Sequence, residues 1–94
     1  MSNSARLRQY VRIREYLASK GVYIDYRKPF RCINPSHQDE KPSCVVFQNP
    51  SSDSIHCFGC GIHGDIFFVV GIMENLTNWT EQYKFLMKKY GHLI

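Results

Sequence analysis

Three cysteines and one histidine have the types and spacing of ligands to a metal ion. Cys32 and His37 form one pair separated by four residues, Cys57 and Cys60 form another separated by two, and nineteen residues lie between the pairs. Zinc binds thiolate sulfur and imidazole nitrogen in a tetrahedron, and a close pair lets one tight turn present two ligands to the same ion. The pattern therefore predicts one structural Zn²⁺ held by all four side chains, with no coordination position left for an activated water.

The chain has a fourth cysteine, and four cysteines could instead form two disulfides. The N-terminal residues contain no apolar signal-peptide core, which favours a reducing cytoplasm, where thiols stay free to bind metal. Cys44 lies in an apolar run that reads as a strand, and a free cysteine in such a place behaves as a small buried hydrophobe. We therefore predict Cys44 to be a core residue and not a ligand.

The neighbours of the second pair leave some alternatives open. His56 directly precedes Cys57, and because neighbours on an extended chain point to opposite faces, we expect it to face away from the metal. His63 follows Cys60 by three residues and is a rival ligand, although its use would leave one member of the first pair without a role. Phe58, in the closing turn, is expected to cover the zinc sulfurs, with an exposed stacking platform as the alternative.

Length and composition limit the class of protein. Ninety-four residues suit a single domain, 1–94, whose core is small enough for a bound metal to contribute substantially to stability. Hydrophobic residues make up 44% of the chain, and aromatic residues 14%, so the composition is not that of a disordered segment. No apolar run approaches about 18 residues, so we expect a soluble protein with no membrane partner.

The elements that position the two ligand pairs follow from residue types. Runs rich in β-branched, aromatic and apolar residues predict short strands at 22–26, 43–47 and 54–57. The segment 49–53 is dense in turn formers, so the last two strands should form an antiparallel hairpin that delivers Cys57 to the metal. The result is a zinc ribbon over 22–61, in which a small sheet holds two ligand turns together.

Helical periodicity predicts three helices, over 4–19, 65–74 and 78–90. The first has a broad apolar arc opposite Arg8 and Arg12, whose side chains would face either solvent or a nucleic acid. The second is apolar on nearly every face and should be central. The third should begin at an N-cap, Thr77 or Asn78. With the ribbon, these helices predict an α+β fold with one N-terminal and two C-terminal helices.

Positive charge is concentrated in the first third of the chain. The net charge is +4 overall, but residues 1–31 hold eight Lys and Arg against two acidic residues, a balance of +6, and the remaining residues are at −2. Such an asymmetry favours a polyanionic partner.

A basic and aromatic segment directly precedes the first ligand pair, and we call it the basic segment. It comprises Tyr23, Tyr26, Arg27, Lys28 and Arg31. A base can stack on an aromatic ring while a neighbouring cation holds its phosphate, so we predict that these residues bind nucleic acid. The alternative is that the tyrosines belong to the core and the charges merely solvate a loop.

Several motifs occur together around the second ligand pair. They are the run Cys57-Phe58-Gly59-Cys60-Gly61, the pair Gly64-Asp65 opening an apolar helix, and Pro42-Ser43 shortly after His37. These motifs resemble the N-terminal zinc-binding domain of DnaG-type bacterial and phage DNA primases. The first ligand pair departs from the family pattern, in which two residues and not four usually separate the cysteine from the histidine.

The resemblance implies recognition of a single-stranded DNA template and support of RNA primer initiation in DNA replication. It implies a cytoplasmic protein, either of a bacterium or of a phage or plasmid in a bacterial host. The implied partners are the template and a primase polymerase domain or a replicative helicase. Primer synthesis needs clustered acidic residues that bind magnesium, and the sequence offers only Asp39-Glu40, so we expect no enzyme activity from this chain alone. The alternative function is a free-standing zinc-ribbon adaptor or regulator that docks a replication or transcription protein.

Overall fold

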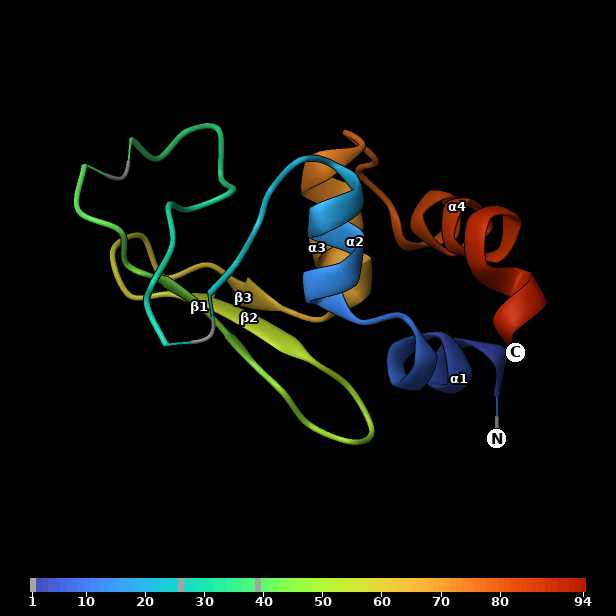
Figure 1. The fold of residues 1–94 in the computed structure, drawn as a ribbon. Helices are drawn as coiled ribbons and strands as arrows, with labels where there is room; N and C mark the ends of the chain where they lie inside the picture. Colours follow the sequence, from blue (N-terminus) through green and yellow to red (C-terminus); the bar gives the residue numbers. More distant parts are fainter. Residues whose placement is uncertain (1, 26, 39) are drawn as a thin grey trace.

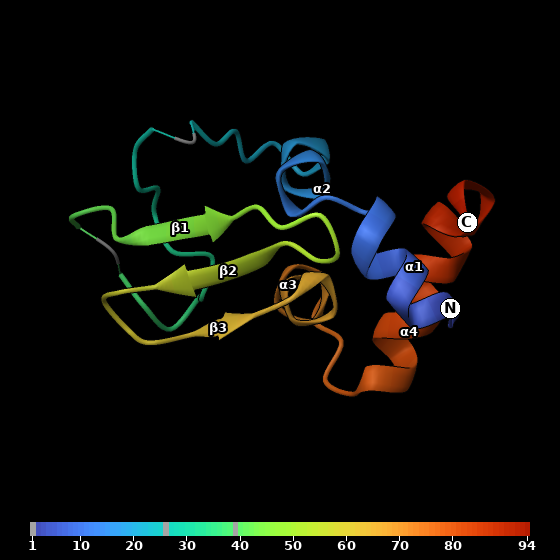
Figure 2. The same ribbon diagram turned by 90° about the horizontal axis from the view of Figure 1, so that it is seen from below.

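The fold places a small sheet on one side and helices on the other. The computed structural model describes residues 2–25, 27–38 and 40–94, and within these residues it contains four α-helices and a three-stranded antiparallel sheet. The helices are α1 (Asn3–Tyr10), α2 (Ile13–Ser19), α3 (Ile66–Met73) and α4 (Trp79–Tyr90), the last continuing into a 3₁₀ turn, Gly91–Leu93. The strands are β1 (Cys44–Phe47), β2 (Ser54–Cys57) and β3 (His63–Gly64). Figures 1 and 2 show α2 and α3 between the sheet and the pair α1 and α4. The predicted α+β class is confirmed.

The sheet has one buried face and one outer face. Its strand order is β1-β2-β3, and Cys44 pairs with Cys57 across the first two strands. Cys44, Ile55 and Cys57 are fully buried, so residues of this parity point toward the helices. Cys44 is therefore a core residue, as predicted from its apolar neighbours.

The strand predicted at 22–26 is wrong, because residues 22–25 form no strand and Tyr26 lies outside the described residues. Phe30 instead pairs with β1, where its N–H donates to the carbonyl of Cys44 at 2.8 Å and its carbonyl accepts from Cys44 at 3.0 Å. This two-bond bridge fixes the chain two residues before Cys32. The loop that carries the first ligand pair is thus attached directly to the sheet.

The single helix predicted over 4–19 is wrong as well, because the chain leaves helical geometry between α1 and α2. Val11 and Arg12 are extended, with ψ angles of 105° and 133°. The carboxylate of Asp53 accepts from the backbone N–H of Ile13 at 3.2 Å and from Nη1 of Arg12 at 2.8 Å. Asp53 is only 2% exposed, and it satisfies a donor at the start of α2 from a position 40 residues away. The break therefore has a tertiary cause.

Arg8 on α1 and Arg12 at the junction with α2 both make contacts with other parts of the fold. Nε of Arg8 lies 2.7 Å from the carboxylate of Asp65, and its guanidinium lies over the ring of Phe67 at 4.9 Å. Arg12 bonds to Asp53 and to the carbonyl of Asn49 at 2.7 Å. Neither arginine is a simple solvated side chain, and both join the N-terminal helices to the rest of the fold.

The two C-terminal helices begin at side-chain caps. The carboxylate of Asp65 accepts from the N–H groups of Phe67 and Phe68 at 3.0 and 3.3 Å, at the start of α3. At the start of α4, the N-cap is Asn78 and not Thr77, because the Asn78 side chain accepts from the N–H of Glu81 at 2.9 Å. Side-chain oxygens of this kind satisfy backbone donors that the helix itself cannot.

The core lies where the buried face of the sheet meets the helices. Its fully buried apolar residues come from α1 to α4 and from the sheet, and they include Leu7, Leu17, Ile55, Val69 and Leu86.

Among the described residues, no helix has the length and apolar content that a membrane crossing requires.

A buried phenol joins α2 to α3 within this core. The hydroxyl of Tyr16 donates to the carboxylate of Glu74 at 2.5 Å, and Nζ of Lys20 lies 3.1 Å from the same carboxylate. Burial raises the pKa of Tyr16 well above its ordinary value, and the hydrogen bond from Tyr16 lowers the pKa of Glu74. The pair thus holds a neutral phenol against an ionised carboxylate.

Candidate metal centre

The structure brings the four predicted zinc ligands together. Cys32 and His37 lie on the loop that precedes β1, Cys57 ends β2, and Cys60 lies in the turn between β2 and β3. One potential donor atom from each side chain lies within 4.8 Å of the others. Among the described residues, this is the one group of three or more such side chains with metal-binding spacing.

The distances between donor atoms fit a zinc tetrahedron. With Zn–S bonds of about 2.3 Å and Zn–N bonds of about 2.0–2.1 Å, the edges of such a tetrahedron are about 3.8 Å between two sulfurs and about 3.5 Å between sulfur and nitrogen. The sulfurs of Cys32 and Cys60 lie 3.7 Å apart, and the sulfur of Cys57 lies 3.5 Å from Nδ1 of His37. Three sulfurs and one imidazole nitrogen at these separations are a donor set placed to bind one zinc ion.

Backbone hydrogen bonds shape the turn that presents the second ligand pair. The N–H of Gly61 donates to the carbonyl of Cys57 at 2.8 Å, and the N–H of Cys57 donates to the carbonyl of Ile62 at 2.9 Å. Gly61 has a φ of +83°, a conformation that side chains with a Cβ rarely adopt. The N–H of Phe58 donates to the carbonyl of Ser43 at 2.9 Å, so the residue before β1 supports this turn as well.

Gly59 lies against the imidazole of His37, and a side chain would not fit there. A Cβ at this position would lie 2.7 Å from Cε1 of His37 and 2.8 Å from Oγ of Ser43. Replacing Gly59 with alanine is expected to displace the imidazole and to weaken zinc binding about tenfold to hundredfold, the range found for residues that support ligands. Chelator competition measures this affinity. Gly91→Ala is the control, because a Cβ there lies an ordinary 3.6 Å from Met87, and equal zinc affinities for the two variants would contradict the expectation.

The thiols of the cluster differ in acidity. Burial acts to raise the pKa of Cys57, but hydrogen bonds from the hydroxyl of Ser43 and the N–H groups of Cys60 and Gly59 outweigh it and lower the pKa to about 6. Burial raises the pKa of Cys32 to about 12, and the nearby charge of Cys57 adds to this rise. Ionised Cys57 thus makes Cys32 harder to ionise, and a bound cation would favour the thiolate form of both.

The rival ligands lie outside the four-residue group. Cys44 is buried in the core, and His56 and His63 are paired partners on β2 and β3, with ring centroids 6.3 Å apart. Phe58 does not cover the sulfurs as expected, because it is 68% exposed and contacts the ring of His56 edge-on at 4.5 Å.

The outer face of the sheet carries aromatic rings that the site prediction did not include. Phe47 is 52% exposed on β1, opposite Ser54, and Phe58 is 68% exposed directly after the last residue of β2. His56 and His63 lie opposite each other on this face. The sequence signal for these positions was the alternation of side chains along β1 and β2. Cys44 and Val46 point to the inner face, so the residues between and after them point to the outer face.

The described part of the basic segment lies on the surface. Tyr23 is 81% exposed, and Arg27, Lys28 and Arg31 are exposed as well, whereas Tyr26 lies outside the described residues. Nε of Arg27 lies 3.4 Å from the carboxylate of Asp25, whose pKa is lowered chiefly by the hydrogen bond from the backbone N–H of Arg27. The exposure of Tyr23 contradicts the alternative that both tyrosines belong to the core.

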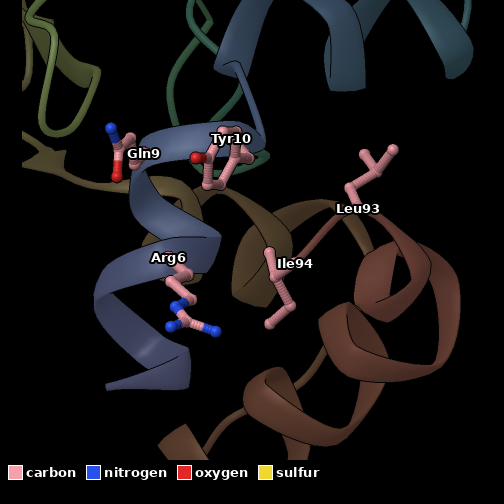
Figure 3. A pocket seen from close by; sticks show the side chains of 5 residues that line it. All are labelled: Arg6, Gln9, Tyr10, Leu93 and Ile94. Atoms are coloured by element: carbon pink, nitrogen blue, oxygen red, sulfur yellow. The ribbon is translucent and has the colours of Figure 1, made fainter. Parts of the chain in front are cut away.

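A surface hollow adjoins the metal centre. A hollow of about 480 Å³ is lined by Arg31, Cys32, His37, Gln38 and Glu40, so the last cation of the basic segment borders the first ligand pair. A second hollow of about 500 Å³ lies between α1 and the C-terminal residues (Figure 3). Its lining, Arg6, Gln9, Tyr10, Leu93 and Ile94, includes no Cys, His, Asp or Glu side chain. Figure 3 shows these residues on α1 and at the C-terminal end of the chain.

Comparisons with known proteins agree with this site. The family model described as CHC2 zinc finger matches residues 2–94. The DNA primase of Aquifex aeolicus is 38% identical over 79 residues, which cover 84% of this chain and 14% of the primase. The DNA primase of Mycolicibacterium smegmatis is 29% identical over 94 residues, 96% of this chain and 14% of the primase.

The chain therefore spans about 14% of the length of these relatives. No solved structure gives a significant match. The family model covers nearly the whole chain, and the cluster of Cys32, His37, Cys57 and Cys60 supplies the cysteines and histidine that a zinc finger requires. This chain belongs to the CHC2 zinc finger family, the zinc ribbon of DnaG-type primases.

Proposed function

We propose that this chain is the zinc-binding module with which a DNA primase recognises its single-stranded template and supports initiation of the RNA primer. The observation that carries the proposal is the position of the basic segment beside the metal centre. Arg31 directly precedes the ligand Cys32, and Phe30 is bonded to β1 on the other side of it. The relatives named above are DNA primases, which supports a nucleic-acid partner.

Anchoring of the basic segment favours binding of a phosphate backbone. Arg27, Lys28 and Arg31 place three positive charges within five residues, and all three are exposed. The bridge between Phe30 and Cys44 and the zinc ligand at Cys32 hold the end of this segment, so less conformational entropy is lost on binding. The ion pair of Arg27 with Asp25 is long and exposed, so a phosphate competes with it at little cost.

The metal has a structural role in this proposal. Cys32, His37, Cys57 and Cys60 would hold one zinc ion, and four protein ligands leave no open position for a reacting water. The chain's own residues then bind and orient the template, and primer synthesis belongs to a polymerase domain in the remaining length of the primase. A polymerase domain or a helicase is accordingly the protein partner that we propose.

A charge-removal experiment tests the nucleic-acid surface. Each phosphate contact to a single strand adds roughly 0.7 to the slope of log affinity against log salt. Replacing Arg27, Lys28 and Arg31 together with alanine is therefore expected to weaken binding of a fluorescent single-stranded oligonucleotide and to flatten the slope by as much as about two units. Anisotropy titrations over a series of salt concentrations measure both quantities.

The control is a triple variant with the same change in net charge, at the exposed residues Arg6, Lys84 and Lys88. This variant is expected to bind with nearly the wild-type slope. The single substitution Tyr23→Ala adds a test of stacking, which contributes about 1–3 kcal/mol per base. Equal slopes and affinities for the wild type and the basic-segment variant would favour the adaptor function, which requires no contact with DNA.

A further inference from the structure

Asn34 contacts both turns of the metal centre from a position between the two ligands of the first pair. Its backbone N–H donates to the sulfur of Cys32 at 3.4 Å, and its side-chain Nδ2 donates to the sulfur of Cys60 at 3.8 Å. Its side-chain Oδ1 accepts from the N–H of Ser36 at 3.0 Å, and its carbonyl accepts from the N–H of His37 at 3.0 Å. One residue thus bonds to two of the cysteine sulfurs and to the backbone of the histidine.

We propose that Asn34 is a positioning residue of the metal centre, which folds the first ligand turn and neutralises part of the thiolate charge. This inference rests on the ligand set of the proposed function. It gives a physical reason why the two members of the first pair can be separated by four residues in this chain.

The first part of the role is geometric. A loop with four residues between its ligands has more conformations to lose than a loop with two, and its ends meet only if the extra residues are folded into a turn. The side chain of Asn34 bonds the chain two residues ahead, at Ser36, in the manner of an Asx turn. The bond from the N–H of His37 to the carbonyl of Asn34 then closes the turn and brings the imidazole toward the sulfurs.

The second part of the role is electrostatic. Three thiolates and a neutral imidazole around Zn²⁺ carry a net charge of about −1, and donors to the sulfurs disperse that charge. Asn34 donates hydrogen bonds to the sulfurs of Cys32 and Cys60. Oγ of Ser43 lies 3.4 Å from the sulfur of Cys57, so each sulfur of the set has a donor. A thiolate that accepts such bonds is a weaker nucleophile, and Cys60 is the exposed member that an electrophile would reach first.

Two substitutions separate the two parts of the role. Asn34→Asp keeps an oxygen that can accept from Ser36, and so preserves the turn, but it removes the N–H donor to Cys60 and adds negative charge. Asn34→Ala removes both interactions. The control is Gln38→Ala, which removes the amide of an exposed residue on the same loop.

The readouts are zinc affinity by chelator competition and the rate at which iodoacetamide modifies Cys60 in the zinc-loaded protein. We expect both Asn34 variants to bind zinc about tenfold to hundredfold more weakly than the wild type and to be alkylated faster, while Gln38→Ala matches the wild type. If the alanine variant fails to fold, the aspartate variant alone decides. An aspartate variant with wild-type zinc affinity and alkylation rate would overturn the proposal, because a turn residue without a role toward the sulfurs gives that result.

Discussion

Replacing Cys57 or Cys60 with serine is expected to release zinc and to unfold most of the chain. Structural zinc binding in small domains contributes about 10–16 kcal/mol at neutral pH, which is as large as the whole stability of a typical domain, about 5–15 kcal/mol. The thiol of Cys57 is buried in the core beside Cys44, so loss of the metal should also disturb the packing of the sheet's inner face. Metal analysis of the purified variants, with circular dichroism, measures both effects.

The control for this experiment is Cys44→Ser. Cys44 is as fully buried as Cys57 and lies directly opposite it in the sheet, but it lies outside the ligand cluster. The variant should therefore be somewhat destabilised and should still bind one zinc per chain. A Cys44→Ser protein without zinc, together with a His37→Ala protein that keeps it, would show that the ligand set is wrong.

Asp53→Ala is expected to cost about 1–3 kcal/mol of the free energy of unfolding, as leaving a buried hydrogen-bond donor unsatisfied does. The carboxylate of Asp53 accepts from the side chain of Arg12 and from the backbone N–H groups of Ile13 and Asn49. Alanine leaves the guanidinium of Arg12 without its main ionic partner and removes the cap at the start of α2. Urea denaturation of zinc-saturated protein measures the loss.

Asp25→Ala provides the matched control. Asp25 also forms an ion pair with an arginine, but the pair is exposed and its atoms are 3.4 Å apart. Exposed pairs of this kind contribute little, so the denaturation midpoint should stay close to that of the wild type. Similar midpoints for the two aspartate variants would mean that the junction between α1 and α2 does not depend on Asp53.

The metal cluster and the hairpin were predictable because their signals are local in the sequence. Two close ligand pairs define two turns, and the turn formers between Phe47 and Ser54 leave few arrangements other than a hairpin. The start of α3 was predictable for the same reason, since the capping carboxylate of Asp65 lies next to the apolar helix that it caps.

The features that the sequence did not predict depend on distant residues. Nothing near Val11 and Arg12 interrupts a helix, because neither residue is a glycine or a proline, and the partner that ends α1 and begins α2 is Asp53. The strand β3 has only two residues, and it forms because β2 provides an edge for His63 and Gly64 to pair with. Periodicity carries no information about partners of this kind.

The strand β2 begins directly after Asp53 and ends at Cys57. It therefore connects the junction of α1 and α2, which Asp53 caps, to the metal centre. Four residues at about 3.3 Å each place the ligand roughly 13 Å from the junction of α1 and α2. Pairing with β1 on one edge and with β3 on the other keeps this strand extended, so the separation between Asp53 and Cys57 is fixed by the sheet. We therefore expect a spectroscopic label at the end of α1 to respond when zinc binds at the opposite end of β2.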